Sequence, residues 1–300
     1  MSRINSTASH SSSVQAMQLS NVSIQLPHTA GVPSSVTAND MARALRAQIA
    51  PSKKNVKSIC TYIPLYLIYR VVNGPFTVNV KSSKCTFYPT EAADFLSLIS
   101  HARPFDAIKD CSGPTIMTLM YDRSAKPKYG AFKQALFGHL DRAALGPGDS
   151  NAVVIKQCWY TCPATGGRFT YDNHTQVTKL TGEINCLRWA SALMGLVYDH
   201  IENYTKVHGP VPLTVPNMHF VKSALAIAED THDTFLLEEV IDDAMDGAFV
   251  KYIGNGSAQP YNFLEEDAIG RAKFLSFAQH LQYMKTDGLA FVSDFQGTLL

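Results

Sequence analysis

The sequence lacks the signals that mark secreted, membrane-spanning and nucleic-acid-binding proteins. Its N-terminus has no apolar core, so no secretory signal is visible. The longest apolar stretch, residues 59–72, contains Pro64 and Arg70 and is too short to span a bilayer. A net charge of +1 gives no reason to expect nucleic acid or an anionic membrane as the main partner. The sequence also contains no internal repeat.

Cysteine is sparse, with six residues in a chain of 300. Without a secretory signal these cysteines are expected to be reduced thiols, which predicts an intracellular, cytoplasmic protein. Cys158 and Cys162 have the spacing C-x₃-C, but no second pair of suitable spacing accompanies them. Because buried free thiols are common, the spacing favours structural thiols over half of a zinc site.

What is present is an ordinary globular composition, 46% hydrophobic and 17% charged, which permits one or two domains with a sizeable core. Residues 1–40 are rich in Ser and Thr and are predicted to be a disordered tail, because they have few large apolar groups to offset the ordering entropy. Residues 41–105 are an N-terminal extension of unknown role, with a helix over 41–50 and a hairpin around residues 73–75. The third region covers residues 106–300.

Hydrophobic patterns predict both helices and strands in the second half of the chain. We expect helices over residues 176–204 and 265–284, and a shorter helix from Pro89 to about His101. The expected strands cover residues 115–121, 151–159, 218–230, 234–241 and 289–294.

A short apolar run near the end of the sequence carries Asp294 and Gln296, two residues apart. On a strand both side chains would leave one face, and each offers a hard oxygen that suits Mg²⁺ held between protein and phosphates. Lys251 ends another short strand and precedes a Gly-Asn-Gly turn centred on Asn255, where backbone and ammonium could approach an anion. These parts predict one nucleotide site that also includes Lys156.

Lys156 follows three apolar residues in a predicted strand. A strand lysine paired with a helical glutamate can bridge ATP phosphates, and Glu183 on the next helix is a candidate partner. Taken alone, a solvated strand end is the more frequent situation for lysine. Glu238 and Glu239 end another strand. They form either the hinge that binds adenine and ribose or simply the polar edge of the strand, and taken alone the second interpretation is favoured. No Walker A motif is present, and residues 130–133 are far from a GxGxxG pattern.

In their order along the chain these segments resemble the alpha-kinases. These are the atypical Ser/Thr protein kinases that include elongation-factor-2 kinase, myosin heavy chain kinases and the kinase domains of TRPM channels, with expanded sets in fungi. The resemblance covers roughly residues 114–300 and rests on GAFKQA, VVIKQ, LLEEVI, GAFVKYIGN, FAQH and DFQG. It implies a two-lobed α+β fold resembling that of protein kinases, without their HRD and DFG motifs.

The resemblance also implies roles for individual residues. Lys156 matches the ATP-binding lysine, and His280 matches the first zinc ligand. Asp294 and Gln296 match the pair beside Mg²⁺, with Asp294 as metal ligand or proton acceptor. The residues expected at the nucleotide are Gly130, Ala131, Phe132 and Lys133 over the phosphates, Glu238, Glu239 and Ile241 at the adenine, and Lys251 and Asn255 nearby. The implied activity is transfer of the γ-phosphate of Mg·ATP to a hydroxyl of an unspecified protein substrate.

The sequence departs from the family pattern after Gly297. The family continues into a Thr-Asp-Pro segment, whose Asp is also catalytic, and into a His/Cys group that completes the zinc site, whereas this chain stops at Leu300. We therefore expect a C-terminally truncated member. A non-catalytic nucleotide-binding or regulatory module is the alternative, and an unrelated α+β protein with chance motifs is a third possibility.

Overall fold

The computed structural model describes residues 79–101, 103–145, 150–212, 214–241 and 249–298. These residues all belong to the larger of the two units into which the chain divides, residues 37–300. The predicted tail over residues 1–40 and the predicted helix over 41–50 lie outside the described residues. The same holds for nearly all of the predicted hairpin.

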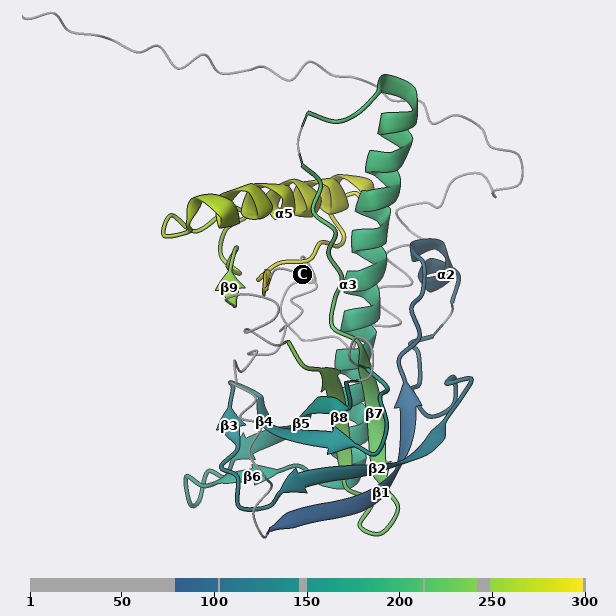
Figure 1. Ribbon diagram of the computed structural model, residues 1–300, viewed down its shortest axis with the longest axis vertical. Coiled ribbons are helices and arrows are strands. Elements are labelled where there is room, and N and C mark those ends of the chain that lie inside the picture. The colour runs from purple at the N-terminus through teal and green to yellow at the C-terminus, as the bar shows by residue number, and fades with distance from the viewer. Residues whose placement is uncertain (1–78, 102, 146–149, 213, 242–248, 299–300) are drawn as a thin grey trace, which may run out of the picture. The chain divides into compact units, whose positions relative to one another are not determined.

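Most of the described strands form one antiparallel sheet, drawn in the lower part of Figure 1. Their bounds are β1 Val80–Pro89, β2 Thr115–Asp122, β3 Lys128–Tyr129, β4 Lys133–Leu140, β5 Ala152–Thr161, β6 Arg168–Thr170, β7 Ser223–Ala228 and β8 Thr234–Glu239. Six of them close into a barrel in the order β4-β2-β1-β7-β8-β5, because β4 pairs with β5 as well as with β2. Strand β3 extends from β4, and β6 extends from β5.

Alternation of side chains along the strands separates the inside of the barrel from its outer face. On β5, Val153 and Ile155 join the barrel core, whereas Cys158 belongs to a second apolar cluster on the outer face. The barrel core also contains Cys85, Phe87, Met117, Leu119, Leu140, Leu145, Ala224, Ala226, Ala228, Phe235 and Leu237. The outer cluster is completed by residues of a long helix that covers part of this face.

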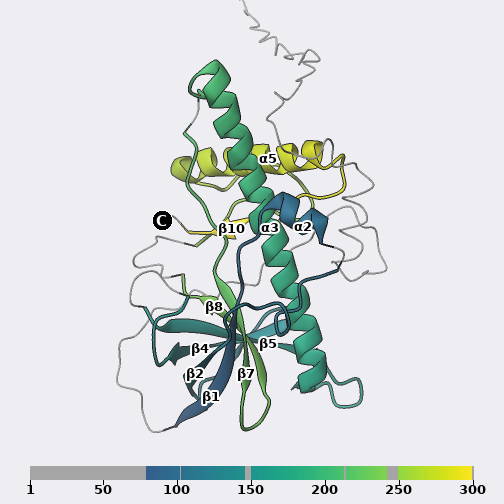
Figure 2. The same ribbon diagram turned by 90° about the vertical axis from the view of Figure 1, so that its right-hand side faces the viewer.

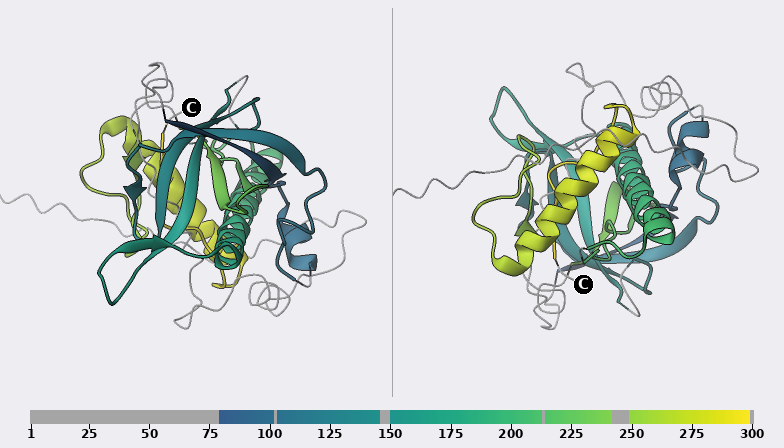
Figure 3. Two further views of the ribbon diagram at one scale, coloured as in Figure 1. Left: turned by 90° about the horizontal axis from the view of Figure 1, so that it is seen from below. Right: turned by 90° about the horizontal axis from the view of Figure 1, so that it is seen from above.

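That helix, α3 (Asn173–His208), contacts the barrel with its first half and a second core with its second half (Figure 2). Leu180 and Ile184 pack on the outer barrel face. Trp189, Leu193 and Val197 are fully buried in the second core, which α3 shares with α2 (Phe95–Ser100) and α5 (Glu266–Lys285). Helix α5 crosses beside α3 in both views of Figure 3. The long helix therefore joins two apolar cores.

Local signals explain where α3 begins and ends. Asp172 caps its N-terminus by accepting a hydrogen bond from the backbone N–H of Thr175, 2.9 Å between the heavy atoms. At the other end Gly209 takes φ 84°, a conformation that favours glycine, and donates its N–H to Thr205 O. Aspartate and glycine thus mark the two ends of the helix.

A second, two-stranded sheet lies near the end of the chain. It pairs β9 (Val250–Lys251) with β10 (Gln296–Gly297), and Lys251 faces Gln296 in the register. The strand predicted over residues 289–294 is wrong, because regular pairing begins only at Gln296. The helix predicted to open at Pro89 is also wrong in extent, since α2 begins at Phe95 after the capping residue Asp94.

The remaining strand and helix predictions agree with the structure to within a few residues, apart from residues 218–230, where β7 is much shorter. The architecture confirms an α+β fold. Strand β1 sits between β2 and β7, so the barrel draws on residues from both sides of the predicted domain boundary at residue 106. No helix in the described part of the chain is long and apolar enough to cross a bilayer.

Candidate functional site

Four charged side chains gather where α3 covers the outer face of the barrel. Lys156 on β5 is 1% exposed and pairs with Glu238 on the neighbouring strand β8. Lys133 on β4 donates to Glu183 on α3 at 2.6 Å. Strand alternation places Lys156 and Cys158 on the same face of β5, opposite to Val153 and Ile155. We call Lys133, Lys156, Glu183 and Glu238 the barrel-face cluster.

Burial dominates the chemistry of Lys156. Removal from water lowers the pKa of its ammonium group to about 8, although the neighbouring Glu238 carboxylate acts to raise it. One oxygen of Glu238, Oε1, is buried without a hydrogen-bond partner. Since buried acceptors are nearly always satisfied, this oxygen is a position where a ligand could donate a hydrogen bond.

Glu183 was the predicted partner of Lys156, and this prediction is wrong. The carboxylate of Glu183 binds Lys133 instead, and Lys156 takes its partner from the sheet. Lys156 and Glu238 lie on neighbouring strands, with Glu238 two residues along β8 from Leu236, the register partner of Lys156, so the two side chains meet diagonally on one face of the sheet. Glu183 still contributes to the electrostatic environment of Lys156.

Residues 130–133 form a turn that is tied to β5. The N–H of Gly130 donates to Lys133 O at 2.8 Å, and the indole N–H of Trp159 donates to Gly130 O at 3.2 Å. Ala131 and Phe132 are exposed, the latter 52%. The turn predicted to cover phosphates is therefore present as a turn, with an apolar side chain at its tip.

The two glutamates predicted to form the adenine hinge lie in different environments. Glu238 faces Lys156, whereas Glu239 accepts the N–H of Lys222 at 3.0 Å and contacts His219 at 3.4 Å. Although burial acts to raise it, the pKa of Glu239 is lowered by these hydrogen bonds and by the charge of His219. Ile241 is half-buried directly after β8.

Lys251 and Asp294 form a second charged pair. Lys251 Nζ lies 2.7 Å from Asp294 Oδ1 in an ion pair, and this close contact with the carboxylate raises the pKa of the lysine. Asp294 adopts φ 60° and precedes β10, so the argument that it leaves one face of a strand together with Gln296 is wrong. The two side chains are related differently: Asp294 binds Lys251, and Gln296 is the cross-strand partner of Lys251.

The turn after β9 contains a glycine whose missing side chain makes room for another residue. Asn255 is exposed in this turn. A Cβ added at Gly254 would lie 2.4 Å from Tyr261 Oη, so the glycine makes room for a tyrosine ring. The close approach at this position is to the protein's own side chain.

The structure thus brings the predicted residues together in two groups, the barrel-face cluster and the pair around Lys251. Each lysine predicted to bind phosphate already has a carboxylate partner. That the two groups share one nucleotide stays a prediction.

The residues predicted to bind metal ions differ in how well their surroundings suit that role. His280 is exposed on α5, and among the described residues no three His, Cys, Asp or Glu side chains gather in a way that could hold a metal ion. Burial raises the pKa of the Cys158 thiol to about 11, which disfavours the thiolate that zinc needs. Zinc therefore does not fit the described residues. Asp294 offers a carboxylate but is paired with the Lys251 ammonium, and Gln296 is the cross-strand partner of that lysine, so a magnesium ion would have to arrive bound to phosphates and displace the ammonium from Asp294.

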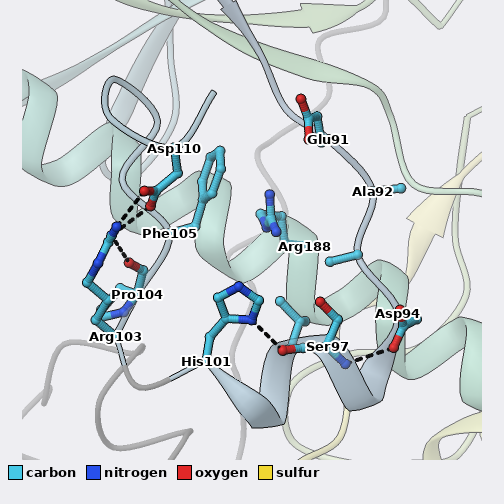
Figure 4. A pocket seen from close by; sticks show the side chains of 12 residues that line it. Glu91, Ala92, Asp94, Ser97, His101, Arg103, Pro104, Phe105, Asp110 and Arg188 are labelled. Carbon is cyan, nitrogen blue, oxygen red and sulfur yellow. Dashed lines mark hydrogen bonds and ion pairs between the residues drawn. The ribbon is translucent and has the colours of Figure 1, made fainter. Parts of the chain in front are cut away.

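One feature was missed by sequence reasoning: a pocket lined by Arg188 of α3 (Figure 4). The available signal was a charged residue between Leu187 and Trp189 on a helix that is otherwise buried at these positions.

No protein-family model matches this chain, and none of the curated proteins compared with it shows a significant match.

Proposed function

We propose that this chain binds Mg·ATP at the barrel face and acts as an alpha-type protein serine/threonine kinase. The observation that carries the proposal is the buried Lys156–Glu238 pair on adjacent strands of an antiparallel barrel, with Glu238 Oε1 left as an unsatisfied acceptor. A nucleotide offers a partner for each of these groups: phosphate oxygens can accept from Lys156, and an amino group can donate to Glu238 Oε1. The order of motifs along the chain supports the same assignment.

Charge neutralisation is the main contribution expected of the protein. Lys156 would exchange part of its interaction with Glu238 for phosphate oxygens, and the turn at residues 130–133 would lie over them. In the transfer step the substrate hydroxyl oxygen bonds to the γ-phosphorus, the bond from that phosphorus to the ADP oxygen breaks, and the hydroxyl proton passes to Asp294. In the alternative role of Asp294, as a metal ligand beside Gln296, the two residues would hold magnesium, which would supply further neutralisation of phosphate charge.

A non-catalytic nucleotide-binding module is the second candidate, and a specific observation favours it. The three lysines expected near the phosphates, Lys133, Lys156 and Lys251, each have a carboxylate partner, so binding must break interactions that the free protein already has. An arrangement of this kind can hold a nucleotide without turning it over. The two candidates share the binding site and differ in phosphoryl transfer.

Calorimetric titration with ATP and Mg²⁺ tests the binding site. We expect Lys156→Met combined with Glu238→Gln to weaken ATP binding by about 10- to 150-fold, the equivalent of a charged hydrogen bond of about 1.5–3 kcal/mol. The double change avoids a buried unpaired carboxylate, so the variant should fold. Lys273→Met, at an exposed position of α5, is the matched control and should leave the affinity unchanged.

Transfer of labelled γ-phosphate to a mixed protein substrate separates the candidates. A kinase should lose transfer on Asp294→Asn while keeping its affinity for ATP in the absence of Mg²⁺ within a few-fold. Binding without transfer by the unchanged protein would establish the non-catalytic module. Equal ATP affinity in the unchanged protein and the folded Lys156 double variant would remove the site assignment altogether.

A further inference from the structure

A pocket of about 440 Å³ lies between α3, the segment before and within α2, and residues 103–110. Figure 4 shows Arg188 reaching into it from α3, with Phe105 on one side and His101 and Ser97 of the α2 region on another. None of its lining residues belongs to the barrel-face cluster or to the pair around Lys251. The pocket is therefore separate from the proposed nucleotide site.

The walls of this pocket are held in place by directional contacts. Asn185 on α3 accepts the N–H of Phe105 at 3.0 Å and donates to Phe105 O at 2.8 Å. Arg103 makes a two-pronged contact with Asp110 at 2.5 and 2.6 Å. On the opposite wall Asp94 accepts the N–H of Ser97 at 2.8 Å. The pocket is thus framed before any ligand enters.

Arg188 is the one lining side chain with buried donors left over. Its Nε and Nη1 are buried and have no hydrogen-bond partner, and its guanidinium lies 3.9 Å from the centre of the Phe105 ring. Burial lowers its pKa, and the charges of Glu91 and Asp110 only partly offset this. Buried charged donors are costly when unpaired, so this group favours an acceptor brought from outside.

The carboxylates around Arg188 are already engaged elsewhere. Asp110 binds Arg103, Glu91 accepts from the Ser112 hydroxyl and Asp94 caps α2. The pocket lining therefore carries three acidic groups against two arginines. That balance repels a dianion such as phosphate more than a monoanion, and a planar carboxylate matches a guanidinium fork.

We propose that this pocket binds a small organic molecule with a single carboxylate, which pairs with Arg188 while its apolar part contacts Leu98, Ala93 and Phe105. The volume of the pocket is within the range typical of small-molecule sites. The apolar contacts leave room for a group larger than acetate. Phe105 supports the guanidinium from one face, so the carboxylate approaches the edge that the pocket leaves open.

The test uses the full chain and measures both binding and thermal stability. The probes are benzoate, its neutral analogue benzamide, succinate and inorganic phosphate, each titrated at constant ionic strength. We expect benzoate to bind saturably and to raise the melting temperature, and we expect benzamide and phosphate to bind at least about tenfold more weakly. Preference for phosphate or succinate over benzoate would overturn the assignment to a monocarboxylate.

Two variants locate the site. Arg188→Met replaces a half-buried guanidinium, whose Nε and Nη1 are buried without partners, with an apolar group of similar length, so it should raise the melting temperature of the free protein and weaken benzoate binding at least tenfold. Arg123→Met removes an exposed arginine outside the pocket and should change neither value. Benzoate binding that survives in Arg188→Met, or no saturable binding in the unchanged protein, would overturn the proposal.

Discussion

Each lysine of the barrel-face cluster has its own glutamate, and burial explains why. An ammonium group removed from water loses several kcal/mol of hydration free energy unless a counter-charge replaces it. Lys156 is almost fully enclosed and Glu238 is fully enclosed, so water contributes almost nothing to stabilising either charge of this pair. Glu183 is 28% exposed at its side chain, so the Lys133 pair keeps contact with water. The Lys156 pair should therefore be the more sensitive of the two to substitution.

The lowered pKa of Lys156 predicts a pH dependence of folding stability. Its pKa falls from 10.5 in the unfolded chain to about 8 in the folded protein. Between these values the unfolded chain binds more protons, so this group makes unfolding less favourable as pH rises from about 8 to 10.5. Below pH 8 Lys156 is protonated in both the folded and the unfolded state. The full free-energy cost of burying its charge then opposes folding.

Chemical denaturation at a series of pH values measures this effect. The free energy of unfolding of the unchanged protein, minus that of the variant with Lys156→Met and Glu238→Gln, should rise by up to about 3 kcal/mol across this window. The subtraction removes the contributions of tyrosines and cysteines. A flat or falling curve for the variant with Lys156→Met and Glu238→Gln would contradict the prediction.

At the scale of elements, α3 is the helix that the other parts share. Its first half packs on the barrel face through Leu180 and Ile184, and its second half is buried with α2 and α5. Its side chains also reach the candidate sites, since Glu183 belongs to the barrel-face cluster and Arg188 lines the pocket. A disturbance of α3 is therefore expected to affect both.

Truncating a buried residue of α3 should show how much its second half contributes. Leu193 is 0% exposed in the core shared with α5, so Leu193→Ala should lower the free energy of unfolding by about 2–5 kcal/mol. Val207, on the same helix, is 68% exposed, and Val207→Ala should change it by less than about 0.5 kcal/mol. Equal effects in urea denaturation would show that the second half of α3 is not packed as described.

At the scale of the whole molecule, closure of the barrel depends on one glycine in β4. Gly138 pairs with Tyr121 of β2 on one side and with Val153 of β5 on the other. A Cβ at this position would lie 2.6 Å from Ile155 Cδ1 and 2.7 Å from the backbone oxygen of Met120. The backbone oxygen cannot move away as a side-chain tip can, so only glycine allows β2 and β4 to approach this closely.

Two glycine substitutions should therefore act in opposite directions. Gly138→Ala should lower the free energy of unfolding by about 1–3 kcal/mol through overpacking. Gly182→Ala, at a helical position with nothing within 4 Å of the added Cβ, should raise it by about 0.5–1 kcal/mol. Thermal unfolding followed by circular dichroism measures both, and stabilisation by Gly138→Ala would contradict the description of the barrel seam.

The sequence alone determined where most helices and strands lie, because the patterns that define them are local. Apolar spacing located α3 and α5 to within a few residues, and short apolar runs located β2, β5 and β8. Lys251 was correctly placed at the end of a short strand. These properties depend on neighbours three or four residues away at most.

Tertiary structure decided which charges meet and which groups stay unpaired. Lys133 and Glu183 are 50 residues apart, and Lys156 and Glu238 are 82 apart, so only strand register and helix placement could select these partners over others. The positive φ of Asp294 and the pocket around Arg188 depend in the same way on distant segments. Electrostatic partners are chosen by proximity in space, which periodicity along the chain does not encode.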